Sequence, residues 1–472
     1  MENHDKRKRS DPLARLERGL LEAFDDLWDN FVDPADALYD VDGSRWAPVG
    51  GEAAFGSGAG VPFSGEPQLS EIRDQCRALA LHNEFAINGH ENRVSYVVGS
   101  GHAYRVSARE NPEPLGPLVR DVQAVLDAFL RTNQWHRRQQ EIVRRCDRDG
   151  EVFLRLFVGP EGAVRVRFVE PSQVSTPTKL SGDPAASFGI QTDPGDVETV
   201  LGYYVDGHWV DASAIQHRKA NVDCNVKRGL PLFYPVRKNL RRAEKLLRNM
   251  SVVAGIQSAI AIIRKHASGS RGSVQQFVQD QAEASVTGRT TGRTSHFQRY
   301  APGTILDAFA GLDYEFPAAA VDASRYVVVL QAELRAIAAR LVMPEFMLTS
   351  DASNANYAST MVAEGPAVKM FQRLQQEMIE DDLEVMRRVT AAAVDAGRLP
   401  REALGTVEIQ AVPPSLAVRD RFKEAHADEI LLRNGVMSVQ TMALRHGLDP
   451  DREQRLIDQR PAEAKGVAKK SP

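Results

Sequence analysis

The sequence has few cysteines, and nothing in their arrangement indicates a disulfide framework or a metal site. Cys76, Cys146 and Cys224 are far apart in a chain of 472 residues, and none belongs to a Cys-x-x-Cys or Cys-His pair. An odd number at wide spacing argues against a disulfide-stapled scaffold and against a zinc ribbon. We therefore expect three reduced, mostly buried thiols in an intracellular protein.

Long hydrophobic runs are also absent. The basic segment 6–9 is not followed by an apolar signal core, and the most apolar window, 252–263, is interrupted by Gln257 and Ser258. A helix that spans a bilayer needs about 20 apolar residues. We expect a soluble protein with no signal peptide and no contact with a membrane.

Strong catalytic motifs are missing as well. The sequence contains no Walker phosphate loop, no His-Glu-x-x-His, no Gly-x-Ser-x-Gly and no tight cluster of Asp and His residues. Each of these motifs holds reactive groups at a fixed spacing, so a degenerate copy would not position them for catalysis. We expect a protein that is not an enzyme and has no cofactor, no catalytic residues and no metal ligands.

Two groups of chemically capable residues have structural interpretations that we prefer. Adjacent helical positions point about 100° apart, so Glu380, Asp381 and Asp382 do not converge on one ion, and we interpret them as a solvated helix face. His217 lies beside Arg218 in a strand-like stretch. With no nucleophile or orienting carboxylate identifiable beside it, we interpret this histidine as structural rather than as a general base.

The balance of charge excludes one large class of partners. The chain has 59 Lys and Arg residues against 63 Asp and Glu, a formal net charge of −4. A protein that reads nucleic-acid sequence normally has a basic domain. Any contact with nucleic acid must therefore be local.

The N-terminal region combines one helix with a segment that buries little apolar surface. Ser10, Asp11 and Pro12 form a helix start, and apolar residues follow over 13–31 at spacings of three and four. Residues 42–67 are rich in Gly, Ser, Pro and Ala. We interpret residues 1–67 as a helix followed by a mobile arm or linker.

Residues 68–234 have the pattern of an α+β domain. We expect a helix over 69–88, a strand over 93–98 and one long helix over 115–146. The alternating stretches "EVFLRLFVG" and "AVRVRFVEP" predict two strands, and "VLGYYVDGHWVD" carries Asp-Gly at a hairpin position. The fold class is therefore α+β, with β-structure that is antiparallel and local.

Long helices dominate the second half of the chain. We expect one uninterrupted helix over 235–265, and then a small inserted module over 266–320 with strands near Pro302 and Gly303. A second helix over 321–341 ends before Pro344, within a segment 321–345. After a loop over 346–361, the predicted elements are a third long helix over 361–396 within segment 362–400, then a helical region 401–472 with helices over 415–460, a turn at Asn434-Gly435 and a disordered basic tail.

The first half of the predicted helix 235–265 is strongly basic. It carries Arg237, Lys238, Arg241, Arg242, Lys245 and Arg248 against Glu244 alone. Such a stripe could follow phosphates, but an isolated run of like charges is more often a solvated or intersubunit face. Both structural interpretations stay open, and in an intersubunit face the partners would be Glu333 or the 380–382 carboxylates of an adjacent subunit.

The loop "TSDASNANYASTM", residues 349–361, consists almost entirely of small polar residues between two helices. Its Ser and Asn side chains offer hydrogen bonds without an ionic grip. Tyr357 could stack on a base or could anchor a helix, and both interpretations remain open.

Several stretches share their order with one known family. They are "NEFAINGHENRVSYVVGSGHAY", "RRCDRDGEVFLRLF" with "VRFVEPSQV", "IQHRKANVDCNVKRGLPLFYPVRKNL", "FPAAAVDASRYVVVLQAELRAIAARLVMPEFMLTSDASNANYASTM" and "NGVMSVQTMALRHGLDPD". In this order they resemble the portal proteins of tailed bacteriophages, especially the lambda-type and related branches. The likeness covers residues 79–459, and the Gly-rich segment 42–67 departs from the family's usual form.

The resemblance implies a portal fold and a particle. It implies an α+β wing over 68–234, a long-helix stem over 235–265 and 321–345, an inserted clip over 266–320, a tunnel loop over 346–361, a long wing and crown helix over 362–400 and a helical C-terminal crown over 401–472. It also implies a homo-oligomeric ring, typically of twelve copies, at one capsid vertex of a virion, assembled in the host cytoplasm. The implied partners are double-stranded DNA without sequence specificity, the terminase large subunit, the major capsid and scaffolding proteins, and head-completion or tail adaptor proteins.

The resemblance also implies roles for particular residues. The residues of the tunnel loop that would lie near DNA are Ser350, Ser353, Asn354, Asn356, Tyr357 and Ser359. The residues of the stem that would contact a neighbouring subunit are the basic residues from Arg237 to Arg248 named above and Glu333. The clip would present to the packaging motor Arg271, Gln275, Gln276, Arg289 and Arg293.

Two other classes of function stay open. One is an enzyme of the same packaging system, an ATPase or a nuclease, which the missing phosphate loop disfavours. The other is a non-viral helical scaffold or adaptor that binds protein partners through its long helices. A ring with a central hole would separate the portal from both alternatives.

Overall fold

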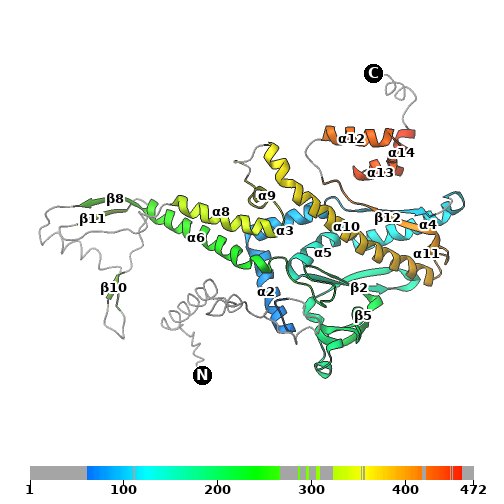
Figure 1. Ribbon diagram of the computed structural model, residues 1–472, viewed down its shortest axis with the longest axis horizontal. Helices are drawn as coiled ribbons and strands as arrows, with labels where there is room; N and C mark the ends of the chain where they lie inside the picture. The colour runs from blue at the N-terminus through cyan, green and yellow to red at the C-terminus, as the bar shows by residue number, and fades with distance from the viewer. Residues whose placement is uncertain are drawn as a thin grey trace, which may run out of the picture. The chain divides into compact units, whose positions relative to one another are not determined.

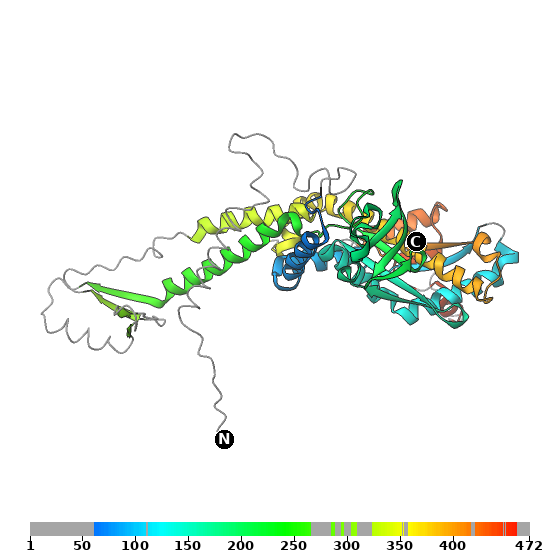
Figure 2. The ribbon, with the colours of Figure 1, turned by 90° about the horizontal axis from the view of Figure 1, so that it is seen from below.

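The computed structural model describes residues 61–109, 112–265, 285–287, 294–296, 304–308, 323–351, 353, 357–416, 421–446, 448 and 450–459. Two compact units divide the chain: Met1–Lys238 with Ala338–Pro472, and Asn239–Ile337 (Figures 1 and 2). The expected helix over 13–31, most of the arm and the basic tail from 460 lie outside the described residues. No helix in the described part of the chain is long and apolar enough to cross a membrane.

The end of the predicted mobile arm is packed rather than free. Phe63 is fully buried and makes an edge-to-face contact with Phe188, at 5.9 Å between ring centroids, and Val61 is also buried. Helix α2 (Glu66–His82) then begins inside the segment expected to be linker. The expectation of a mobile arm is therefore wrong for residues 61–67, because two apolar side chains in a Gly-rich context suffice to attach the segment.

The predicted helix 69–88 is two helices, and the predicted strand 93–98 is wrong. Asn83 ends α2 and caps α3 (Glu84–Val97), its side chain accepting hydrogen bonds from the amides of Phe85 and Ala86. The buried residues of α3 recur at helical spacing: Ala86, Gly89, His90, Arg93, Val94 and Val97. The short alternation of apolar and polar residues after Arg93 was read as a strand, because so few residues cannot distinguish the helical period of 3.6 from the strand period of 2.

The predicted helix 115–146 is also interrupted. Helix α4 (Pro112–Asn133) and helix α5 (Trp135–Asp149) meet at Gln134, whose φ of 48° is left-handed. Asn133 fixes this corner, since its side chain donates to the carbonyl of Val164 at 3.0 Å and accepts from the amide of Val166 at 2.8 Å. A strand distant in sequence thus selects the corner.

Two antiparallel sheets form the β-layer of the first unit. One has the order β3 (Val164–Val169), β2 (Glu151–Val158), β7 (Ile215–Lys219), and the other the order β4 (Ile190–Asp193), β5 (Asp196–Val205), β6 (His208–Asp211). The predicted β2–β3 pair and the Asp206-Gly207 hairpin are confirmed, with φ of 50° and 76° at the turn. The two sheets share an apolar core: Phe153, Val169, Val174, Ile190, Tyr203, Val205, Val210 and Ile215.

A third sheet joins segments that lie some 300 positions apart in the chain. Strand β1 (Ala103–Ala108) pairs antiparallel with β12 (Val407–Val412), from Ala103 opposite Val412 to Ala108 opposite Val407. The expectation that all β-structure is local is therefore wrong here. Gln123 of α4 binds backbone groups of β1, accepting from the amide of Val106 and donating to the carbonyl of Tyr104.

The predicted third helix is confirmed. Helix α10 (Tyr357–Asp395) packs against α3 and α4, and Pro366 lies within it (Figure 1). Helix α9 (Glu345–Thr349) precedes it, and α11 (Ala403–Thr406) follows. The C-terminal helices α12 (Arg421–Arg433), α13 (Val439–Arg445) and α14 (Pro450–Asp458) agree with the predicted helical region, and Gly435 turns with a φ of 69°.

Two long helices dominate the second unit. Helix α6 (Arg237–Ala259) and helix α8 (Ala323–Arg340) lie side by side (Figures 1 and 2). They contribute the buried side chains Leu240, Ala243, Leu330, Leu334 and Ile337. The predicted second helix is confirmed, and it ends before Pro344 as expected.

The uninterrupted helix expected over 235–265 is wrong in its last turns. Helix α6 ends at Ala259, and strand β8 (Ile260–Lys265) pairs in parallel with β11 (Thr304–Ala308). Three β-branched isoleucines between 260 and 263 favour a strand once a partner is present. Strand β11 lies next to Pro302 and Gly303, where strands were predicted, whereas the antiparallel pair of β9 (Ser285–Thr287) and β10 (Thr294–His296) was not predicted.

Candidate functional site

The segment expected to be a tunnel loop is shorter than its predicted bounds. Residues Glu345–Thr349 form α9, and α10 begins at Tyr357, so only 350–356 lies between helices. Ser350 and Ser353 are exposed, while Asn354 and Asn356 lie outside the described residues. Tyr357 and Ser359 belong to the first turns of α10, where only the backbone is described.

The start of this loop is held by helix α3. Asn88 donates through Nδ2 to the carbonyl oxygens of Met347 and Leu348, at 3.0 and 2.7 Å, and Asn92 donates to Met347 at 2.8 Å. Gly89 lies between them on α3, and a Cβ there would approach Leu341 Cδ1 to 2.4 Å. The two asparagine side chains thus hold carbonyl groups at the end of α9, where a helix leaves carbonyls without intrahelical partners. The only signal of this contact in the sequence was the spacing of Asn88, Gly89 and Asn92 on α3.

The exposed beginning of the loop carries a negative charge. Asp351 accepts a hydrogen bond from the amide of Ser353 at 2.9 Å, and hydrogen bonds from Ser353 lower the pKa of this carboxyl. Asp351 is therefore ionised at neutral pH. The interpretation of the loop as wholly neutral overlooked this residue, whose charge repels phosphate.

The basic stripe of α6 has an exposed face, on which Arg248 is paired with Glu244, and a further contact toward α8. Arg241, Lys245 and Arg248 are exposed at spacings of four and three, which places them on one face of the helix. Arg242 instead forms an ion pair with Glu333 of α8 at 3.0 Å, and Asn239 donates to the same carboxylate at 2.7 Å. Glu333 therefore has partners within its own chain.

Helix α8 exposes an apolar run that the sequence reading did not single out. Tyr326, Val327, Val328 and Val329 are 39%, 39%, 66% and 49% exposed. Four successive helical positions cover about 300° around the axis. The signal was the uninterrupted "YVVV", because a helix with only one buried face does not carry four apolar residues in a row.

The acidic trio on α10 is not a solvated face, so that interpretation is wrong. Asp382 is fully buried and accepts hydrogen bonds from Tyr104, Trp135 Nε1, Gln139 and Arg218, the last at 2.8 Å. Burial raises the pKa of Asp381 to about 6, while the nearby charge of Arg218 opposes the shift. Only Glu380 is exposed. Burial of an ion requires several donors at once, and those donors come from segments remote in sequence.

His217 lies in strand β7, and the expectation that no orienting carboxylate stands beside it is wrong. Its Nε2 lies 2.9 Å from Glu151, and its ring stacks on Phe153 at 4.1 Å between centroids. Glu151 is fully buried and also binds Arg73, Arg228 and the amide of Gly229. Burial alone would raise the pKa of Glu151, but the charges of Arg228 and Arg73 hold it well below its usual range. No nucleophile is part of this cluster.

The remaining predicted residues are reported by position. The clip residues Arg271, Gln275, Gln276, Arg289 and Arg293 lie outside the described residues. None of the three cysteines forms a disulfide; Cys76 is buried, Cys146 is half-buried and Cys224 is exposed, so the expectation of mostly buried thiols is not met for Cys224. Across the described residues, no group of three or more His, Cys, Asp or Glu side chains could hold a metal ion.

The comparisons with known proteins point in one direction. The sequence model of the family described as "Phage portal protein, lambda family" matches residues 61–375. Comparison with curated protein sequences gave no match.

Solved structures with a similar fold were also found. A chain from the neck of a native gene transfer agent particle, computed with C12 symmetry, is 18% identical, with 86% of this chain and all of that chain covered and a TM-score of 0.41. A portal protein of the HK97 family from Corynebacterium diphtheriae is 14% identical, with 75% and 97% covered and a TM-score of 0.31. Because both TM-scores are below 0.5, the family assignment depends on the sequence match alone.

Proposed function

This chain belongs to the lambda family of phage portal proteins, and from that premise we propose how its surfaces serve a head–tail connector. Copies of the chain close side by side into a ring, typically of twelve, at one vertex of the capsid. The ring is part of the virion and is assembled in the host cytoplasm. It has no catalytic activity of its own, so neither the ATPase nor the nuclease of a packaging system is proposed.

The observation that carries the ring is the exposed apolar run on α8. Tyr326, Val327, Val328 and Val329 point to most sides of one helix, and each is at least 39% exposed in the single chain. Exposed apolar patches mark interaction sites, and a run on several sides of one helix needs cover from more than one direction. A ring supplies such cover, because a heterologous contact gives every subunit two neighbours. An adaptor that binds one partner would cover only one side.

The exposed basic stripe gives the same ring a polar contact. Arg241, Lys245 and Arg248 share one face of α6, and Glu244 lies 3.1 Å from Arg248. We propose that this face meets acidic residues of the neighbouring subunit. Glu380 suits that role, whereas Asp382 is buried and Glu333 is paired within its own chain.

The loop between α9 and α10 is proposed to face double-stranded DNA in the channel. Ser350, Ser353, Asn354, Asn356, Tyr357 and Ser359 would offer transient hydrogen bonds without sequence specificity. Lys and Arg contacts to phosphate can account for a loss of about a thousandfold or more in affinity between low and moderate salt. A conduit needs a weaker hold, and the ionised Asp351 weakens it further.

The other partners follow from the position of a portal in its particle. The inserted module, with Arg271, Gln275, Gln276, Arg289 and Arg293, is proposed to dock the terminase large subunit and later the head-completion or tail adaptor proteins. The wing is proposed to contact the major capsid and scaffolding proteins.

The experiment is to measure the mass of the purified chain by analytical ultracentrifugation and to image it by negative stain. We expect closed rings with a central hole wide enough for a duplex. Val328→Asp is expected to leave mostly monomers, since it buries a charge in the contact. Val328→Thr, which keeps the β-branched shape, should retain rings. A wild-type chain that stays monomeric at every concentration would overturn the proposal, and rapid ATP or DNA hydrolysis by the pure protein would restore the enzyme.

A further inference from the structure

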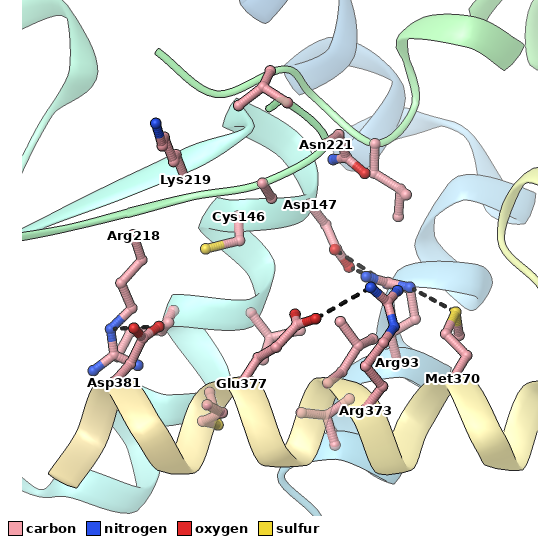
Figure 3. A pocket seen from close by; sticks show the side chains of 18 of the residues that line it. Arg93, Cys146, Asp147, Arg218, Lys219, Asn221, Met370, Arg373, Glu377 and Asp381 are labelled. Carbon is pink, nitrogen blue, oxygen red and sulfur yellow. Dashed lines mark hydrogen bonds and ion pairs between the residues drawn. The ribbon is translucent and has the colours of Figure 1, made fainter. Parts of the chain in front are cut away.

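The first unit contains an open cavity of about 610 Å³ that no proposed role of the portal uses. Its wall is built from α3, α5, the end of β7, the loop 220–223 and α10 (Figure 3). Five cationic side chains line it: Arg93, Arg218, Lys219, Arg340 and Arg373. The carboxylates in the wall are Asp147, Asp223, Glu377 and Asp381.

Most of these carboxylates are already occupied. Asp147 accepts from Arg93 Nε at 2.9 Å, Asp381 lies 3.5 Å from Arg218, and Glu377 lies 3.2 Å from Arg373 (Figure 3). The exception in the described wall is Asp223, which is exposed to solvent. The other three carboxylates of the wall are therefore already paired with arginine side chains.

Several guanidinium nitrogens, in contrast, lack a good acceptor. Arg93 is buried, and its Nη1 donates to the thioether sulfur of Met370 at 3.6 Å (Figure 3), although sulfur is a weak acceptor. Arg218 Nη1 is also buried with no hydrogen-bond partner, but Arg218 is paired with Asp381 and Asp382 and lies at the other end of the cavity (Figure 3). A buried donor with only a weak acceptor costs free energy, so the Arg93 end of the cavity favours a negatively charged occupant.

Arg340 is a second cation at this end of the cavity, and no ion pair joins it to a carboxylate among the described residues. Its Nε donates to the carbonyl of Leu232 at 3.2 Å, and its Nη2 donates to the side chain of Asn221 at 2.9 Å. Burial, and then the positive charge of Arg93, lowers the pKa of Arg340, while the charge of Asp147 opposes the shift. Asp147 is already bound to Arg93, so a further anion between the two guanidinium groups would relieve their repulsion.

We propose that this cavity binds a small oxyanion of the phosphate class, held by Arg93 and Arg340. The planar, multiply donating guanidinium group matches the oxygens of phosphate better than it matches a spherical ion such as chloride. The bound ion joins α3 to the end of α8 through two cations that share one carboxylate of the wall, Asp147. The proposal concerns a single chain and does not depend on ring closure.

Titration of inorganic phosphate into the full chain, at ionic strength held constant with KCl, tests the proposal. We expect a saturable heat of binding and a saturable rise of the thermal midpoint that KCl alone does not produce. Arg340→Gln is expected to weaken phosphate binding roughly tenfold or more, since it removes one charged donor. Arg401→Gln, an exposed change after α10, is the matched control and should bind as the wild type does.

A second variant tests the same cavity in the opposite direction. Met370→Glu places a carboxylate next to Arg93 Nη1, so it should raise the thermal midpoint without phosphate and abolish the response to phosphate. If Met370→Glu does not fold, Arg340→Gln decides alone. A wild-type response that KCl reproduces, or equal phosphate affinity in Arg340→Gln and Arg401→Gln, would overturn the proposal.

Discussion

The backbones of Gly150 and Gly229 cross so closely that a Cβ atom on Gly229 would lie 1.9 Å from the carbonyl oxygen of Gly150. The crossing joins the start of β2 to the loop that carries Arg228. It brings the amide of Gly229 to 3.1 Å from Glu151, and the amide of Ala220 donates to the carbonyl of Gly150 at 2.8 Å. The buried cluster around Glu151 therefore depends on two positions where no side chain fits.

Gly229→Ala is expected to lower the free energy of unfolding by about 3 kcal/mol, because the added methyl group meets backbone atoms that cannot rotate away. Chemical denaturation measures the effect. Gly116→Ala is the matched control: no atom lies within 4 Å of its Cβ position in α4. That substitution should raise the stability by about 0.5 to 1 kcal/mol, since alanine favours a helix. Equal changes in unfolding free energy for the two substitutions would show that the backbones of Gly150 and Gly229 do not approach so closely.

Asp382→Asn is expected to cost about 3 to 5 kcal/mol, since it leaves the buried Arg218 without its closest charge partner. The ion pair measures 2.8 Å, and the carboxylate is fully buried. Urea unfolding of the variant tests this. Glu380→Gln, two positions away on the exposed side of α10, should change the stability by no more than about 0.5 kcal/mol. If both variants lost similarly small amounts of unfolding free energy, the interpretation of residues 380–382 as a solvated helix face would be correct after all.

The stability difference between wild type and Asp381→Asn should depend on pH. The pKa of Asp381 is raised to about 6 in the folded chain, against about 3.9 in an unfolded chain. The folded state therefore binds more protons between these values, so the carboxylate costs stability as the pH rises from about 4 to 6. Because the side chain is 42% exposed, we discount the loss to roughly 1 kcal/mol for solvent screening. Thermal melts at pH 4 and pH 7 measure this. The stability of Asp381→Asn relative to the wild type should be higher at pH 7 than at pH 4. The same stability difference at both pH values would count against the raised pKa.

Asn88→Ala is expected to loosen the entrance to the loop without unfolding the chain. It removes both hydrogen bonds to the last turn of α9, so amide exchange over 345–351 should accelerate roughly tenfold or more. Hydrogen exchange with mass spectrometry measures this. Asn92→Ala, which removes a single bond, should have a smaller effect. Unchanged exchange in Asn88→Ala would show that packing of Leu348 alone holds α9.

The periodic elements were predictable because their signals are local. The hairpin at Asp206-Gly207, the strands β2 and β3, and the long helices α8 and α10 were all recognised from spacing and turn chemistry within short windows. The misjudged elements have distant causes. The chain turns at Gln134 because the side chain of Asn133 donates a hydrogen bond to the carbonyl of Val164 in β3. Residues 260–265 form strand β8 rather than more helix because they pair with β11 at 304–308.

The sequence by itself determined the α+β class, the order of the long helices, the polar composition of the loop and, through the shared order of several stretches, the family. Only the tertiary structure decided that Asp382 is buried, that Glu151 orients His217 and that Arg93 and Arg340 face one cavity. Periodicity reports which side of an element avoids water, since that depends on neighbours a few residues away. The partner of a buried charge comes from anywhere in the chain, so it is fixed only when the elements pack.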